Sequence, residues 1–289
     1  MRVLRGDILT EAVQGCLEKM GSHLNADPGK PVDYQMVIGE QKVDLNPSLG
    51  KTIELKFSGN IFCCHCGRKT NKSFSQGFCF PCFKKLARCD SCIMSPEKCH
   101  YYEGTCREPE WGETYCMVPH VVYLANSSGL KVGITRQTQI PTRWIDQGAA
   151  QALPIFQVHN RRMSGLVEDL FRSELNDRTH WQAMLKGEPE PLNLAAERER
   201  LYGLFDQRVS HLIQTEQGAE VTKLLDTEMV EIAYPVLEYP VKVKSINPEK
   251  TPEIGGTLLG IKGQYLILDT GVINIRKFTA YEAEFRAIL

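Results

Sequence analysis

The sequence predicts an α+β protein with a metal-binding segment, and three observations lead to this prediction. Apolar and polar residues alternate near both ends of the chain, between turn signals. Of the 11 cysteines, all except Cys16 lie between Cys63 and Cys116. Stretches with helical spacing separate the cysteines from the C-terminal end. We therefore expect a small antiparallel sheet with helices, a zinc-ribbon-like segment and a small terminal β domain.

The composition is that of an ordinary globular protein. The 289 residues are 42% hydrophobic and 24% charged, with a formal net charge of −1. No apolar run approaches the roughly 18 residues that a membrane helix needs, and the first residues lack an unbroken apolar core. We expect a cytoplasmic protein with no membrane partner. In a reducing compartment, clustered cysteines favour metal binding over disulfides.

Five segments follow one another along the chain. Residues 1–59 form an N-terminal β segment, in which 33–58 contain a few antiparallel strands with turns at Asn46-Pro47 and Leu49-Gly50. Residues 60–117 are the cysteine-rich segment, and 118–186 mix strand and helix patterns as an α/β module.

The remaining two segments complete the chain. Residues 187–225 contain an amphipathic helix from Asn193 to Gln217, with Asn193 as N-cap and Gly218 as the stop. Residues 226–289 form a C-terminal β segment with a hairpin turn at Asp269-Thr270-Gly271. We expect the two terminal β segments to pack on each other.

Two closely spaced cysteine pairs predict the first metal site. Each C-x2-C sequence folds a tight knuckle whose two thiolates face one ion, and two knuckles complete a tetrahedral site. Gly67 suits the turn of the first knuckle. Cys64 falls out of register and is expected to be a packed thiol. The predicted zinc ligands are Cys63, Cys66, Cys79 and Cys82.

A second metal site is expected in the following residues. We favour a second zinc, although thiolate ligands suit either zinc or an iron–sulfur cluster. His100, Cys116 and His120 lie nearby as alternative ligands. The favoured ligands are Cys89, Cys92, Cys99 and Cys106.

The first half of the cysteine-rich segment is basic. Residues 60–88 contain no Asp or Glu, and phenylalanines are interleaved with the basic residues. Basic side chains for phosphates and aromatic faces for bases predict a DNA or RNA partner. The alternative is that the phenylalanines form the core of a small metal domain. The candidate nucleic-acid contacts are Arg68, Lys69, Lys72, Lys84, Lys85 and Arg88, together with Arg136 at the end of a later strand.

The stretch "VVYLANSSGLKVGITR", residues 121–136, pairs two apolar runs around a turn and resembles the paired motif of the GIY-YIG nuclease superfamily. Tyr123 stands at the first motif's tyrosine, and Gly133 at the second motif's glycine. Arg143 matches the family's catalytic arginine, and Glu168 its metal-binding glutamate. Lys131 replaces the usual tyrosine of the second motif. The resemblance covers about residues 118–180.

The resemblance implies a Mg²⁺-dependent endonuclease. Glu168 would bind Mg²⁺, and Arg143 would clamp the phosphate as charge develops. Tyr123 would position or deprotonate the attacking water. Because a tyrosine with its usual pKa is a poor base at neutral pH, Lys131 is expected to lower the pKa of Tyr123.

Other interpretations remain open. Glu174 is a rival to Glu168, since both lie on one predicted helix. Each site residue also has a structural interpretation as a packed or surface residue. The chain could bind RNA without cleaving it, or sense metal or oxidation through Cys64 and Cys116. The whole chain also resembles a bacterial family of unknown function, which implies no activity.

Overall fold

The computed structural model describes residues 11–175, 180–216 and 220–287. The chain divides into two compact units. Unit 1 runs to Phe83 and adds Leu185–Gly187 and the chain from Ala233 onward, whereas unit 2 holds Lys84–Met184 and Glu188–Ile232. The boundary between Phe83 and Lys84 therefore passes through the cysteine-rich segment. Antiparallel sheets combine with helices, so the predicted α+β class is confirmed.

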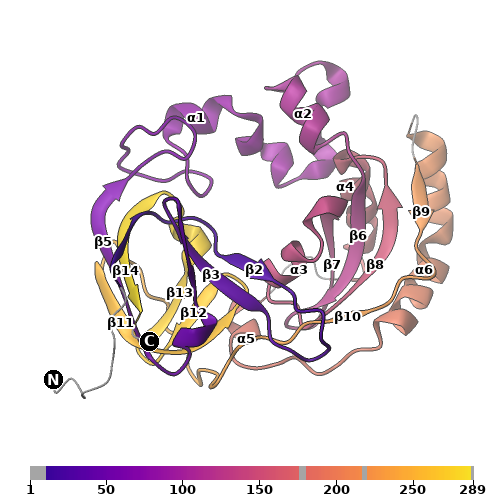
Figure 1. Cartoon of the computed structure of the whole chain (residues 1–289). Helices are drawn as coiled ribbons and strands as arrows, with labels where there is room; N and C mark the ends of the chain where they lie inside the picture. The colour runs from indigo at the N-terminus through magenta and orange to yellow at the C-terminus, as the bar shows by residue number, and fades with distance from the viewer. Residues whose placement is uncertain (1–10, 176–179, 217–219, 288–289) are drawn as a thin grey trace. The chain divides into compact units, whose positions relative to one another are not determined.

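Unit 1 is built mainly of strands from both ends of the chain. Six of them form one sheet in the order β1-β14-β5-β11-β12-β13, and three form a second sheet in the order β2-β3-β4. The strands are β1 (Val13–Cys16), β2 (Gly21–His23), β3 (Asp33–Ile38), β4 (Gln41–Asp44), β5 (Thr52–Ile61), β11 (Glu253–Lys262), β12 (Tyr265–Leu268), β13 (Gly271–Asn274) and β14 (Tyr281–Ala287). Figure 1 shows β5 beside the yellow C-terminal strands.

Turns of unit 1 follow the sequence signals. Asn46 opens the 3₁₀ turn η1 (Asn46–Ser48), and its side-chain oxygen accepts the backbone N–H of Tyr34 at 2.9 Å. The hairpin between β12 and β13 turns at Asp269-Thr270, and Leu268 lies opposite Gly271. Gly271 has a φ of 148°, which a side chain would strain. A second 3₁₀ turn, η7 (Ile275–Phe278), precedes β14.

Unit 2 begins with short turns and continues as a sheet with helices. Its 3₁₀ turns are η2 (Ala87–Cys89), η3 (Ser91–Ile93), η4 (Pro96–Lys98), η5 (Tyr101–Glu103) and η6 (Gln137–Gln139). Its helices are α2 (Pro109–Tyr115), α3 (Thr142–Asp146), α4 (Arg161–Phe171), α5 (Trp181–Met184) and α6 (Leu194–Thr215), and α1 (Phe80–Lys85) spans the unit boundary. Its strands are β6 (His120–Asn126), β7 (Leu130–Arg136), β8 (Gln151–Val158), β9 (Val221–Lys223) and β10 (Val230–Glu231).

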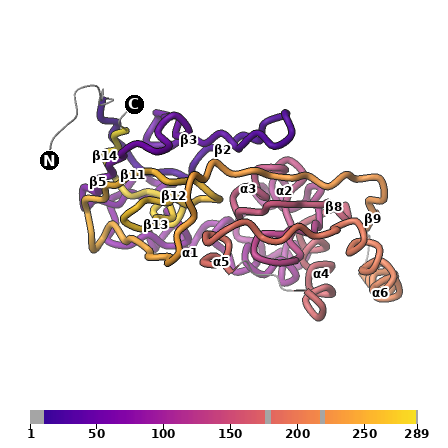
Figure 2. Tube along the Cα trace, turned by 90° about the horizontal axis from the view of Figure 1, so that it is seen from below, coloured from indigo at the N-terminus to yellow at the C-terminus, as the bar shows by residue number. Residues whose placement is uncertain are grey.

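The unit 2 sheet is antiparallel and centred on β6 and β8. Strand β6 lies between β7 and β8, and both β9 and β10 pair with the outer edge of β8. In Figure 2, β9 runs beside β8. Every residue of β6 is buried, so this strand forms the floor of the unit.

Alternate residues of β6 serve different purposes. Val122 and Leu124 enter a core with Phe156 of β8 and with α4 and α6. Because side chains alternate along a strand, Tyr123 points to the opposite face, where its ring meets Trp144 of α3 at 6.0 Å between centroids. Both faces of β6 are therefore buried, one in the core with α4 and α6 and the other beside α3 at the candidate site.

Helices α4 and α6 begin with asparagine caps. The side-chain oxygen of Asn160 accepts the N–H of Met163 at 2.8 Å, and that of Asn193 accepts the N–H of Ala196 at 3.0 Å. Asn193 is therefore the N-cap that the sequence indicates, whereas Gln217 and Gly218 lie outside the described residues. Across the described ranges, none of the helices combines the length and the apolar character required to span a membrane.

Candidate functional site

The two predicted knuckles come together in unit 1. The sulfur atoms of Cys63, Cys66, Cys79 and Cys82 all lie within 4.8 Å of one another. The sulfurs of Cys66 and Cys79 are 3.8 Å apart. A tetrahedron of thiolates with bonds of about 2.3 Å to a central zinc has edges of about 3.8 Å. The cluster is therefore compatible with a zinc site.

Local backbone geometry holds the first knuckle. The N–H of Gly67 donates to the carbonyl of Cys63 at 2.9 Å, and Gly67 has a φ of 70°. A left-handed turn of this kind favours glycine, as the sequence indicates. The thiol of Cys64 lies against Gly77, where a Cβ atom would come within 2.6 Å of its sulfur. Cys64 is thus turned away from the cluster.

The knuckle thiols have opposed pKa values. Burial opposes ionisation of Cys63, but backbone hydrogen bonds outweigh it and lower the pKa of Cys63 to about 6. Burial and hydrogen bonds from neighbouring thiols raise the pKa of Cys82 to about 12. Four thiols in one place cannot all carry charge without a cation, so this division is expected of a metal-binding cluster.

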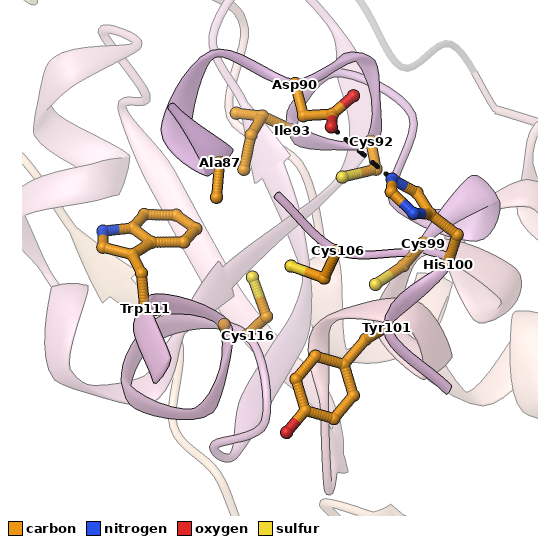
Figure 3. A pocket seen from close by; sticks show the side chains of 11 residues that line it. Ala87, Asp90, Cys92, Ile93, Cys99, His100, Tyr101, Cys106, Trp111 and Cys116 are labelled. Atoms are coloured by element: carbon orange, nitrogen blue, oxygen red, sulfur yellow. Dashed lines mark ion pairs between the residues drawn. The ribbon is translucent and has the colours of Figure 1, made fainter. Parts of the chain in front are cut away.

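The second half of the segment contributes to a pocket. Cys92, Cys99, Cys106 and Cys116 line one pocket of unit 2, together with the apolar side chains of Ala87, Ile93 and Trp111 (Figure 3). Cys89 is buried but does not line this pocket.

The pocket lining thus includes three of the four favoured ligands, Cys92, Cys99 and Cys106, and adds the alternative ligand Cys116. Asp90 is extended, with a ψ of 156°, between the 3₁₀ turns that hold Cys89 and Cys92.

A compact group of mixed ligands borders the same pocket. One oxygen or nitrogen of Asp90 and His100 and the sulfur of Cys92 lie within 4.8 Å of one another. Asp90, however, has a different partner, since its carboxylate is 2.7 Å from the guanidinium of Arg107. Nδ1 of His100 is 2.7 Å from the hydroxyl of Thr105. This group is accounted for as an ion-pair and hydrogen-bond network.

Cys64 and Cys116 are the two thiols considered for redox sensing. Burial raises the pKa of Cys64 to about 11 and that of Cys116 to about 11. Oxidation-sensitive cysteines react as thiolates, and both groups remain thiols at neutral pH.

The candidate nucleic-acid residues are mostly exposed. Arg68, however, is engaged, because a hydrogen bond to the sulfur of Cys66 raises the pKa of Arg68. Phe80 keeps 53% of its surface exposed, whereas Phe74 packs between Phe80 and Phe83. The exposed basic residues are Arg68, Lys69, Lys72, Lys84, Lys85 and Arg88, and they are divided between the two units after Phe83.

Arg136 lies elsewhere. It is half-buried at the end of β7, with its guanidinium 4.8 Å from the centre of the Tyr115 ring. This cation–π contact gives Arg136 a structural role, and its contact with phosphate stays a prediction.

Strands β6 and β7 place Tyr123 opposite Gly133. A Cβ atom at Gly133 would lie 2.7 Å from the phenol oxygen, so only glycine leaves room for this ring. Gln147, after α3, donates from Nε2 to the phenol oxygen at 2.8 Å. Nζ of Lys131 donates to Oε1 of Gln147 at 2.6 Å. A chain of hydrogen bonds therefore joins Lys131 to Tyr123.

Arg143 of α3 and Glu168 of α4 lie near enough to influence the same phenol. The charge of Arg143 lowers the pKa of Tyr123 and the charge of Glu168 raises it, so the three side chains share one electrostatic neighbourhood. Arg143 is exposed, whereas Glu168 keeps 9% of its surface exposed and lies 3.7 Å from the guanidinium of Arg172. The rival Glu174 is exposed and lies beyond the end of α4.

The expected activation of Tyr123 is not found. Burial, reinforced by the charge of Glu168, raises the pKa of Tyr123 in spite of the guanidinium of Arg143 and the amide of Gln147. Lys131 was expected to lower this pKa, but its ammonium is directed to Gln147. The phenol therefore stays protonated at neutral pH.

Comparison with known proteins places the chain in a family. A family model described as "Protein of unknown function (DUF2797)" matches residues 50–283. The chain belongs to this family. No curated protein and no solved structure matches it. The DUF2797 match includes both thiol sites and the residues around Tyr123.

Gln147 is the residue of this candidate site that sequence reasoning missed. It follows Arg143 by four residues, so a helix starting near Thr142 would place both side chains on one face. This four-residue spacing could have identified Gln147 as a neighbour of Arg143. The place of Cys116 in the pocket lining had a weaker signal, because it lies ten residues beyond Cys106 and outside any short pair.

Proposed function

We propose that this protein hydrolyses phosphodiester bonds in nucleic acid with the help of Mg²⁺. The observation that supports the proposal is the electrostatic influence of a guanidinium and a carboxylate, from two separate helices, on one phenol of the sheet. Tyr123, Arg143 and Glu168 are also the residues on which the resemblance to GIY-YIG nucleases rests. Their order and spacing in the chain support the same chemistry.

The residues present suit Mg²⁺ in one respect. This hard cation often takes one or two carboxylates and completes its shell with water and substrate phosphate. Glu168 of α4 supplies one carboxylate, which is mostly buried and lies 3.7 Å from the guanidinium of Arg172. When bound, Mg²⁺ would polarise the phosphate and stabilise the leaving oxygen.

The other side chains have distinct roles in this proposal. Exposed Arg143 would hold the phosphate and counter its developing charge through two parallel N–H donors. Tyr123 would act as a hydrogen-bond donor that orients water or phosphate, because its raised pKa keeps the proton on oxygen. Lys131 would donate to the amide oxygen of Gln147, and the amide nitrogen of Gln147 would donate to the phenol oxygen. Together these two hydrogen bonds would position the phenol.

Cleavage assays with matched variants test the proposal. The full-length protein with Mg²⁺ is offered single-stranded and branched DNA and RNA, and we expect cleavage of at least one of them. Glu168→Gln should lower cleavage by about 100-fold or more, as the loss of a major electrostatic contribution does. Glu174→Gln, an exposed carboxylate beyond the same helix, should leave it unchanged. Equal activity of the two variants would contradict the role of Glu168.

A second candidate function is nucleic-acid binding without cleavage. It is favoured by the complete burial of Tyr123, which keeps the phenol from bulk water. Lys69, Lys72 and the exposed ring of Phe80 would then contact the nucleic acid. Binding should weaken steeply with salt, because phosphate contacts release counterions. Lys69→Glu with Lys72→Glu should lower affinity, whereas Glu168→Gln should not.

We also propose that zinc occupies the knuckle cluster. The 3.8 Å separation of the Cys66 and Cys79 sulfurs supports this metal, because it fits thiolates that share one small ion. Metal analysis of the purified chain, with Cys64→Ser as a control outside the cluster, tests it. One zinc per chain that is lost in Cys66→Ser is the expected result.

A further inference from the structure

The thiol pocket of unit 2 differs from the knuckle cluster in a way that points to another metal centre. Four cysteines surround it, at spacings C-x6-C-x6-C-x9-C. Figure 3 shows the sulfur atoms of Cys92, Cys99, Cys106 and Cys116 around the middle of the pocket, while His100 and Asp90 stand to one side with a dashed contact between them.

The pocket is wider than a zinc tetrathiolate. It encloses a cavity of about 10 Å³, which admits the centre of a water-sized sphere. Sulfur atoms in contact with such a sphere lie farther from its centre than the about 2.3 Å of a zinc–sulfur bond. In agreement, Cys99, Cys106 and Cys116 do not form a group whose sulfurs all lie within 4.8 Å. An iron–sulfur cluster binds its thiolate ligands through several irons, so its cysteine sulfurs lie farther apart than those of a zinc site.

A buried arginine adds a second observation. Arg161 begins α4, and its backbone N–H donates to the carbonyl of Cys116 at 2.8 Å. Its Nη2 donates to the carbonyl of Ile93 at 2.7 Å, but its buried Nε has no hydrogen-bond partner among the described residues. The positive charge is close enough to act on Cys92, Cys99 and Cys116. A buried cation and an unused donor beside four thiols fit an anionic group in the pocket.

The wall of the pocket is suited to the same group. Ala87, Ile93 and Trp111 close one side with apolar atoms (Figure 3), which shields a cluster from water. A Cβ atom at Gly112 would lie 3.1 Å from the Tyr101 ring and 3.5 Å from the sulfur of Cys106, so glycine keeps this wall open. The network of Asp90, Arg107 and His100 lies at the rim.

We propose that Cys92, Cys99, Cys106 and Cys116 bind an iron–sulfur cluster. Each thiol releases its proton and forms one bond to iron, and inorganic sulfide bridges the irons. This assignment makes Cys116 a ligand and excludes Cys89. It is independent of the proposed hydrolysis, because none of the four cysteines contacts Tyr123, Arg143 or Glu168 in any described interaction.

Isolation of the full-length chain without oxygen, followed by reconstitution with iron and sulfide, tests the assignment. We expect a brown protein with equal amounts of iron and acid-labile sulfide, as well as zinc in the knuckle cluster. Four irons per chain would indicate a cubane and two a rhombic cluster, and both support the proposal. A chain that takes up zinc in the pocket and retains no iron would overturn it.

Two serine variants locate the ligands. Cys116→Ser should lose most of the iron and sulfide, whereas Cys89→Ser, a buried cysteine three residues before Cys92, should retain both. Equal retention by the two variants would overturn the choice of Cys116. Since Cys116→Ser could fail to fold, X-ray absorption at the iron edge of the unchanged protein gives an independent answer. Iron surrounded by sulfur supports the cluster, and iron bound to oxygen or nitrogen alone contradicts it.

Discussion

The two halves of the cysteine-rich segment use the same ligand residue in different ways. In the knuckle cluster, each pair of thiols comes from one tight turn, and four sulfurs converge within 4.8 Å. In the thiol pocket, Cys92, Cys99 and Cys116 come from three different turns or helix ends and Cys106 from a connecting loop, and all four line one cavity. Short spacing therefore determines a site locally, whereas wide spacing leaves the site to the packing of the unit.

The comparison extends to the means by which each region is held together. The knuckle residues keep many exposed side chains and have little apolar core. Unit 2 buries a continuous core between its sheet and helices α4 and α6. All three tryptophans, Trp111, Trp144 and Trp181, belong to unit 2. Tryptophan fluorescence thus follows unit 2 alone, and the two regions can be tested separately.

The largest effect is expected from loss of a knuckle ligand. Structural zinc contributes about 10 kcal/mol or more to small metal domains. Cys79→Ser should abolish zinc binding at the cluster and expose residues 61–83 to proteases, while tryptophan fluorescence stays unchanged. Metal analysis and limited proteolysis provide the measurement, with Cys64→Ser as control. A protease-resistant Cys79→Ser segment would show that packing, and not metal, holds the knuckles.

In unit 2, side-chain packing should make the largest contribution to the free energy of unfolding. Gly133→Ala would push a Cβ atom to within 2.7 Å of the buried Tyr123 ring and should cost about 2 kcal/mol in the free energy of unfolding. Denaturant unfolding followed by tryptophan fluorescence measures it. Gly203→Ala is the control, because nothing lies within 4 Å of its new Cβ atom. That control should be neutral or stabilising, since alanine favours a helix.

Acid should weaken unit 2 through His120. Burial lowers the pKa of His120 to about 4 from its usual 6.5, and its buried Nε2 has no partner among the described residues. The unfolded chain therefore binds the proton more readily, and stability is lost as the pH falls from about 6.5 toward about 4.

Between about pH 7 and about pH 5 the expected loss is about 2 kcal/mol. It is measured by urea unfolding with tryptophan fluorescence. His120→Gln, which does not titrate, should remove most of this pH dependence. The same loss in both proteins would assign it to other groups.

The smallest effect is expected at the phenol. Tyr123→Phe removes the acceptor of the Gln147 amide and should cost about 1 kcal/mol in unit 2. Tyr102→Phe serves as a control, because that ring is 68% exposed and its hydroxyl only accepts from Asn160. If Tyr123→Phe left cleavage unchanged, the phenol would be a structural group, and the site would reduce to Arg143 and Glu168.

Local signals in the sequence predicted a substantial part of this protein. The knuckle pairs, the hairpin of residues 121–136 and the helix cap at Asn193 depend on neighbouring residues, and the structure has each of them. The grouping of Tyr123, Arg143 and Glu168 as one catalytic site stays a prediction, supported by the influence of both charges on the phenol. Their protonation states could not be anticipated, because burial depends on every element packed around the phenol.

Residue types and close spacings by themselves determined the strands, the helix beginnings and the four knuckle thiols, since these depend on contacts within a few residues. Only the tertiary structure decided that Cys116 and not Cys89 borders the pocket, that Tyr123 is enclosed, and that the cysteine-rich segment divides between two units. Each of these depends on which distant surfaces the apolar side chains bury together, and that choice is made by the whole chain.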